Sequence, residues 1–211
     1  MKKTLLFSNL IGDISSSNSI DQCSFNEYTA EYLKNNVKKN SKLVFIDAPG
    51  FGNEENYLNT IINCFKKIGV FFDKVIDINK QMDDMKGENV VYFLMGGNPI
   101  TQFEIIKKNN LELKIKNHQG LVIGFCAGAI NLSKYAIITS DQDFNQPDSY
   151  LGLNRIDLTL EPHYESELKR DLELKGFAKK YNIEILAIPD QSIIIVEDDQ
   201  KIEKGKIYRI S

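Results

Sequence analysis

Residues 122–132 read Val-Ile-Gly-Phe-Cys-Ala-Gly-Ala-Ile-Asn-Leu (VIGFCAGAINL), an apolar run followed directly by a run of small residues. Gly124, Cys126 and Gly128 form a Gly-x-Cys-x-Gly motif, the pattern of a sharp strand-to-helix turn known as the nucleophile elbow. A strand that passes straight into a helix is typical of α/β folds with a parallel sheet. The stretch therefore predicts an α/β fold with a cysteine at the carboxyl end of a strand.

The residue types of this turn follow from its geometry. The turn is strained, so the neighbours of the nucleophile must be small, and Gly124, Ala127 and Gly128 meet that need. The motif would place the Cys126 side chain above the carboxyl ends of the strands, where open α/β sheets bind ligands. The N-terminus of the following helix favours a thiolate, and the N–H of Ala127 could hold an oxyanion. A buried cysteine in a tight strand–helix junction would need the same small residues, so the rest of the chain must decide.

Short apolar runs alternate with amphipathic stretches along the chain. The alternation up to about residue 136 predicts a mostly parallel central sheet with helices on both faces. Closely spaced apolar runs after residue 183 predict an antiparallel C-terminal hairpin. The sequence shows no internal repeat and no low-complexity linker, so we expect residues 1–211 to form one domain. Strands are predicted over residues 4–8, 43–47, 74–78, 90–95, 121–125, 156–160, 183–188, 193–196 and 206–210.

The composition excludes several classes of function. The chain has 211 residues, 42% of them hydrophobic and 26% charged, as is ordinary for a globular domain. Its net charge of −3 and its scattered lysines do not indicate nucleic-acid binding. No segment approaches the roughly 18 consecutive apolar residues of a membrane span. We therefore expect a protein that binds neither nucleic acid nor membranes.

The N-terminal start and the cysteines bear on the compartment. Residues 1–13 superficially resemble a signal peptide, but the uninterrupted apolar part, residues 5–7, is shorter than the about 7–15 residues of such a signal. We expect a buried strand there instead. Three cysteines without metal-like spacing favour a reduced, cytoplasmic environment. Cys64 is expected to be buried on a helix face, and Cys23, in a polar segment, to be an exposed thiol.

Two helices have recognisable end signals. Ser24 is expected to cap a helix over residues 25–36, with Glu27 completing a capping box. Asn53 is expected to cap the next helix, and Gly69 to end it.

A nucleophilic thiol needs a base, and the chain has only two histidines. His118 precedes the strand that ends at Cys126, and eight extended residues separate the two by roughly 26 Å. His118 is therefore expected in an exposed loop at the opposite edge of the sheet. His163 follows the predicted strand 156–160, so it should lie at a carboxyl end, and Pro162 fixes the backbone before it. His163 is the candidate base.

The remaining roles have candidates at other strand ends. The sequence Gly96-Gly97-Asn98 follows the predicted strand 90–95, and glycine lets the backbone approach a ligand closely, so the N–H of Gly97 is the second oxyanion donor expected. Asp190 follows the strand 183–188 and is the favoured acid to orient His163. Glu165 is the alternative acid, and Asp141 a weaker third.

Four segments together carry a family likeness. In their order and spacing they resemble the dipeptidase E and cyanophycinase-like serine peptidases, whose fold is class I glutamine-amidotransferase-like. The likeness extends from the first predicted strand to the last hairpin. The segments are MGGNPITQF (95–103), GFCAGAINL (124–132), EPHY (161–164) and IPDQSIIIV (188–196).

The resemblance implies a role for each site residue. Cys126 stands where that family has its nucleophilic serine, and His163 stands at the position of the base. Gly97 and Ala127 match the oxyanion hole, and Asp190 matches the acid. The implied activity is hydrolysis of peptide bonds next to aspartate, through an acyl-enzyme and without cofactor or metal. The main departure is cysteine in place of serine.

Substrate contacts and partners are expected from the same likeness. Recognition of aspartate calls for a cation, and Arg155 is the arginine assigned to it, with Asn98 as a further substrate contact. The partners expected are a small peptide or amino-acid-derived substrate and a second copy of the chain in a homodimer.

Two other functions remain open. Cysteine in this elbow is also similar to the glutaminase half of class I amidotransferases, where the acid lies two residues after the histidine, as Glu165 does after His163. The chain could instead be a catalytically degenerate homologue that binds a ligand or senses oxidants through Cys126.

Two further motifs are not supported. Residues 141–152 begin like a calcium loop but have Gln146 where the glycine is needed, so a solvated loop is expected. Residues 48–53, Ala-Pro-Gly-Phe-Gly-Asn, lack the third glycine of a dinucleotide fingerprint.

Overall fold

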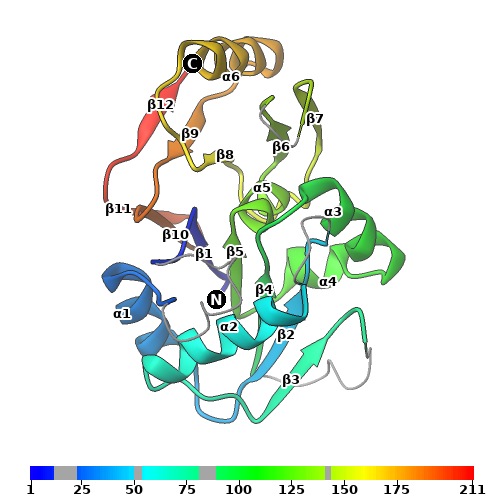
Figure 1. Ribbon diagram of the computed structural model, residues 1–211, viewed down its shortest axis with the longest axis vertical. Coiled ribbons are helices and arrows are strands. Elements are labelled where there is room, and N and C mark those ends of the chain that lie inside the picture. Colours follow the sequence, from blue (N-terminus) through cyan, green and yellow to red (C-terminus); the bar gives the residue numbers. More distant parts are fainter. Residues whose placement is uncertain (12–22, 50–53, 81–88, 141–143) are drawn as a thin grey trace.

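A seven-stranded sheet runs through the centre of the molecule in the order β11-β10-β1-β5-β4-β2-β3 (Figure 1). The computed structural model describes residues 1–11, 23–49, 54–80, 89–140 and 144–211. The five strands from β1 to β3 in that order are parallel, and β10 and β11 are antiparallel to their neighbours. Their bounds are β1 Lys3–Phe7, β2 Lys42–Ile46, β3 Lys74–Asp77, β4 Val90–Leu94, β5 Leu121–Phe125, β10 Ile193–Glu197 and β11 Gln200–Lys204.

Helices cover both faces of this sheet because its strands are apolar on both sides. Along β4, Val91 and Phe93 pack in one core, and Tyr92 and Leu94 pack in the other. The first core includes residues of α1 and α2, and the second includes residues of α3, α4 and α5. The predicted α/β architecture is therefore confirmed. These helices span α1 Glu27–Asn36, α2 Glu54–Lys67, α3 Pro99–Lys108, α4 Glu112–Asn117 and α5 Ala127–Leu132.

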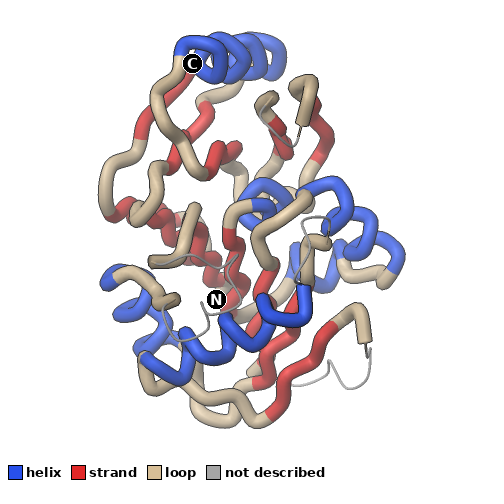
Figure 2. Tube along the Cα trace, in the orientation of Figure 1, coloured by secondary structure: helices blue, strands red, loops and turns tan. Residues whose placement is uncertain are grey.

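A smaller layer lies beyond the carboxyl ends of the parallel strands (Figures 1 and 2). It consists of the sheet β12-β9-β8, the pair β6-β7 and the helix α6. Leu174 and Phe177 of α6 pack with residues of β9 and β12 in a third core. The bounds are β6 Tyr135–Ile138, β7 Asp148–Leu151, β8 Thr159–Pro162, α6 Leu168–Tyr181, β9 Ile185–Ile188 and β12 Tyr208–Ile210.

The predicted antiparallel C-terminal strands are also confirmed, but they belong to two different sheets. β10 and β11 form the hairpin, whereas β12 pairs with β9 in the smaller sheet. The predicted strand over residues 156–160 is displaced, because β8 begins at Thr159 and runs to Pro162. β6, β7 and β11 were not predicted, and β7 and β11 are mostly exposed and polar.

Two local predictions are wrong. Asn26, not Ser24, caps α1: its side chain accepts a hydrogen bond from the N–H of Thr29. Cys23 is fully buried in the first core, as Cys64 is, because it packs among the apolar residues between the sheet and its helices. Gly69 does end α2, with a positive φ of 76°. Asn53 lies outside the described residues.

Among the helices of the described ranges, none has the length and apolar character that a membrane crossing requires.

Candidate active site

Cys126 occupies a strained position between β5 and α5. Its backbone has φ 49° and ψ −108°, a combination that costs about 1–3 kcal/mol for a residue with a side chain. Hydrogen bonds on both sides hold it: its N–H donates to the carbonyl of Phe7 (3.0 Å), and its carbonyl accepts from the N–H of Ala129 (2.9 Å). The strain is therefore sustained by the sheet and the helix together, as a nucleophile elbow requires.

His163 lies at the end of β8, on the other side of the same opening. It too has a positive φ, 51°, and the N–H of the next residue, Tyr164, bonds the carbonyl of Ile188 on β9 (3.1 Å). The Nδ1 of His163 is 2.8 Å from Oδ1 of Asp190, which follows β9. The Nδ2 of Asn9, just after β1, donates to the other oxygen of Asp190 (3.0 Å). Residues that follow three strands, β1, β8 and β9, are thus joined by hydrogen bonds through the carboxylate of Asp190.

The electrostatics of His163 favour its charged form. Burial by itself lowers the pKa of His163, but the charge on Cys126 and the hydrogen bonds to Asp190 and Cys126 outweigh it, and the pKa rises to about 10. The pKa of Asp190 is lowered, mainly by the hydrogen bond from His163; burial opposes this effect, and the hydrogen bond from Asn9 adds a smaller lowering. The ring therefore interacts with the thiol group of Cys126 on one side and with a carboxylate on the other.

We expect the two histidines to titrate on opposite sides of the ordinary value of about 6.5. His163 should titrate near pH 10 and His118 below the ordinary value, because burial lowers the pKa of His118. A raised pKa in the folded state stabilises the protein fully below pH of about 6.5, and this contribution is lost as the pH rises through about 10. NMR of the ring protons across this range measures both values.

The control for this titration is the Asp190→Asn variant. It should lower the pKa of His163, because the ring loses its carboxylate partner, and leave His118 unchanged. A ring of His163 that titrates at or below 6.5 in the parent protein would contradict the arrangement.

The Gly96-Gly97 turn lies beside Cys126. A Cβ added to Gly96 would be 3.2 Å from the Cβ of Cys126, and one added to Gly97 would be 2.2 Å from the carbonyl oxygen of Ala48. Gly97 also has a φ of 132°, so only glycine fits this position. Ala127 is the first residue of α5, where backbone N–H groups have no partner within the helix. Of the two expected oxyanion donors, Gly97 lines the cavity together with Cys126, and Ala127 directly follows Cys126 in the chain.

A cavity of about 330 Å³ connects these groups to the smaller layer. Its lining includes Cys126, His163 and Gly97, and also the polar residues Thr139, Glu161 and Arg170. Its apolar lining includes Met95, Pro99, Ile130, Ile138 and Phe144.

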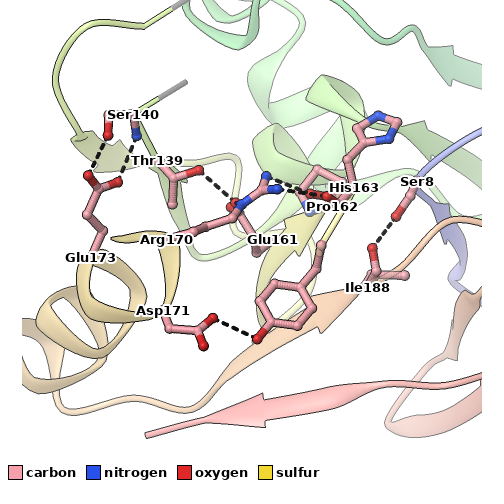
Figure 3. Close-up of polar contacts among 11 residues, drawn as sticks. Ser8, Thr139, Ser140, Glu161, Pro162, His163, Arg170, Asp171, Glu173 and Ile188 are labelled. Carbon is pink, nitrogen blue, oxygen red and sulfur yellow. Dashed lines mark hydrogen bonds and ion pairs between the residues drawn. The ribbon is translucent and has the colours of Figure 1, made fainter. Parts of the chain in front are cut away.

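Two charged residues of this cavity were missed from the sequence. Nε of Arg170 on α6 donates to Glu161 of β8 (2.7 Å), and its two terminal nitrogens donate to the carbonyls of His163 (2.7 Å) and Pro162 (3.2 Å) (Figure 3). The hydroxyl of Thr139 donates to the same carboxylate (2.8 Å). The available signal was position: Glu161 and Arg170 flank His163 closely in the sequence.

The predicted substrate contact of Arg155 is wrong, and that of Asn98, which lies between the lining residues Gly97 and Pro99, stays a prediction. Arg155 is buried at the amino ends of the strands, where its guanidinium donates to Thr4 Oγ1 and to the carbonyls of Lys3, Ile115, Lys116, His118 and Gly120. The side-chain oxygen of Asn98 accepts from the N–H groups of Ile100 and Thr101, so Asn98 caps α3. Neither residue lines the cavity.

Of the alternative acids, Glu165 is not the partner of the ring. Glu165 is exposed, and the Nδ1 of His163 already bonds Asp190. Asp141 lies outside the described residues. His118 lies at the far edge of the sheet, as expected, but it is half-buried, with Nε2 2.8 Å from the carbonyl oxygen of Val90.

The calcium-like and glycine-containing segments lie partly outside the described residues. Within it, no group of three or more His, Cys, Asp and Glu side chains could hold a metal ion. Residues 141–143 of the calcium-like segment and residues 50–53 of the glycine segment lie outside the described ranges.

Comparisons with known proteins bear on the family and the fold of the chain. The model of Peptidase family S51 matches residues 14–204 of the chain. The fold is similar to the crystal structure of a candidate peptidase E protein from Listeria monocytogenes EGD-e, with a TM-score of 0.65 and 17% sequence identity over 97% of this chain and 98% of that chain. The comparison with curated protein sequences finds no match.

Proposed function

The chain belongs to peptidase family S51, as the resemblance to dipeptidase E-like peptidases predicted, and we propose that it hydrolyses short peptides through an acyl-enzyme on Cys126. The observation that carries this proposal is the position of His163 between the thiol group of Cys126 and the carboxylate of Asp190. A base held between a nucleophile and an orienting acid is the arrangement that acyl transfer needs.

The reaction follows from these positions. The sulfur of Cys126 attacks the scissile carbonyl carbon, and the N–H groups of Gly97 and Ala127 stabilise the negative charge on the carbonyl oxygen. His163 then protonates the amine that leaves as the C–N bond breaks, and a thioester remains. Water attacks the thioester, His163 takes its proton, and the thiol and a carboxylic acid are released. Asp190 keeps the ring oriented through Nδ1 throughout.

The choice of acid favours a peptidase over a glutaminase of the Cys-His-Glu type. In that type the acid would be Glu165, which is exposed, whereas Asp190 occupies Nδ1 of the ring.

A parallel assay of dipeptides and free glutamine tests the proposed activity. We expect new amino groups from dipeptides and no ammonia from glutamine, with a mass increase on Cys126 when the reaction is quenched in acid. Ammonia release from glutamine without dipeptide hydrolysis would instead support the amidotransferase-like alternative. A variant with Glu165→Gln serves as control and should keep the dipeptide activity, because this side chain is exposed and does not contact the ring.

A further inference from the structure

The cavity that Cys126 lines also contains a buried ion pair. Glu161 is only 2% exposed, and its carboxylate is 2.7 Å from Nε of Arg170. Both side chains line the cavity that Cys126 and His163 also line. We take the side chain next to the scissile carbonyl of a substrate at Cys126 to occupy the space that this pair bounds, because all these residues line the same cavity.

The pair leaves little free charge in the cavity. Of the five N–H groups of Arg170, one donates to Glu161 and two donate to the carbonyls of Pro162 and His163 (Figure 3). The positive charge is thus matched by a carboxylate of the protein itself. Cys126 and His163 add no net charge, whether the proton lies on the sulfur or on the ring.

This charge balance determines which side chain fits. A substrate carboxylate would bring a second negative charge next to Glu161 in a partly desolvated site, where like charges repel strongly. An uncharged side chain avoids that repulsion and can still accept a hydrogen bond from Arg170. The apolar residues Ile130, Ile138 and Phe144 on the cavity wall suit the same class of side chain.

We propose, on the premise of the proposed function, that the cavity selects substrates with an uncharged side chain next to the scissile bond, and that Glu161 is the residue that excludes acidic ones. The proposal departs from the aspartate that the family resemblance implies. It assigns a specificity-determining role to Glu161, through its ion pair with Arg170.

Two nearly isosteric dipeptides test the proposal in the parent protein. Asn-Ala and Asp-Ala differ only in the charge of one side chain, and we expect kcat/KM for Asn-Ala to be at least about 10-fold higher. In the Glu161→Gln variant the negative charge is removed while an oxygen remains for Arg170 and Thr139. The Asp-Ala to Asn-Ala ratio should then rise by at least about 10-fold.

The matched control is Glu167→Gln. It removes the same charge from an exposed residue next to α6 that makes no side-chain cap hydrogen bond, so the ratio should stay at the parent value. The comparison of Asn-Ala with Asp-Ala in the parent protein needs no variant. It therefore still tests whether the cavity prefers an uncharged side chain if Glu161→Gln does not fold.

A binding measurement separates this proposal from the proposed function. Iodoacetamide alkylation of Cys126 is followed by mass spectrometry with and without each dipeptide. Stronger protection by Asn-Ala without hydrolysis of either dipeptide supports the cavity's preference and overturns the hydrolase. Hydrolysis or protection that is equal for both dipeptides, or greater with Asp-Ala, overturns the preference. If neither dipeptide protects Cys126 and neither is hydrolysed, both the preference of the cavity and the proposed hydrolase function are overturned.

Discussion

The Cys126→Ala variant is expected to lower kcat/KM for dipeptide hydrolysis by about 10⁴-fold or more. The reaction passes through a bond to the sulfur, and the cavity offers no replacement at the end of β5. Alanine keeps the Cβ and adopts the same backbone, so binding of the substrate should change little. Steady-state kinetics on a hydrolysed dipeptide measure the loss, and the melting temperature checks that the variant is folded.

Cys64→Ala is the matched control for this loss. Cys64 of α2 is fully buried in the first core and does not line the cavity, so its substitution removes a thiol without changing the cavity wall. We expect its kcat/KM to stay within about twofold of the parent. A Cys126→Ala variant that retains most of the activity would place the nucleophile elsewhere.

The Gly128→Ala variant should lower the free energy of unfolding by about 3 kcal/mol or more. A Cβ at this position would lie 2.2 Å from the carbonyl oxygen of Leu94 on β4, and this oxygen belongs to a buried strand that cannot easily shift. For a chain of this size, about 3 kcal/mol corresponds to a fall of roughly 10 °C in the melting temperature. Thermal and urea unfolding measure the change.

Gly176→Ala is the opposite case within the same protein. Gly176 lies inside α6, and an added Cβ would meet nothing within 4 Å. Because alanine favours the helical conformation more than glycine does, the free energy of unfolding of this variant should be about 0.5–1 kcal/mol higher than that of the parent. Equal melting temperatures for the two variants would contradict the close approach of α5 to β4, on which the position of Cys126 beside the Gly96-Gly97 turn depends.

The sequence predicts best where a local pattern fixes both the element and its end. Cys126 directly follows β5 of the central sheet, whereas His163 and Asp190 follow β8 and β9, which are parallel neighbours in the smaller sheet. Each of the three residues therefore lies at the carboxyl end of a strand, where α/β folds place their ligand sites. Gly97 likewise lies shortly after the carboxyl end of a strand, β4. These positions could be placed without tertiary information because a single residue at a strand end carries each of them.

Long side chains and polar strands could not be placed in this way. Arg155 is close to His163 in the sequence, but its side chain reaches the amino ends of β1 and β5, where it bonds the carbonyl of Gly120. Cys23 has polar neighbours in sequence but packs into an apolar core that other segments build. The ion pair of Glu161 and Arg170 joins a strand to a helix, and no periodicity reveals such a contact.

The most direct test of the central claim compares the rates at which the three cysteines react with iodoacetamide at neutral pH, in the parent protein and in a His163→Ala variant. We predict that Cys126 of the parent is alkylated fastest, since Cys23 and Cys64 are fully buried, and that His163→Ala slows this reaction by at least about 10-fold. Slow alkylation of Cys126, unchanged by loss of His163, would contradict the claim that these two residues form a nucleophile and its base.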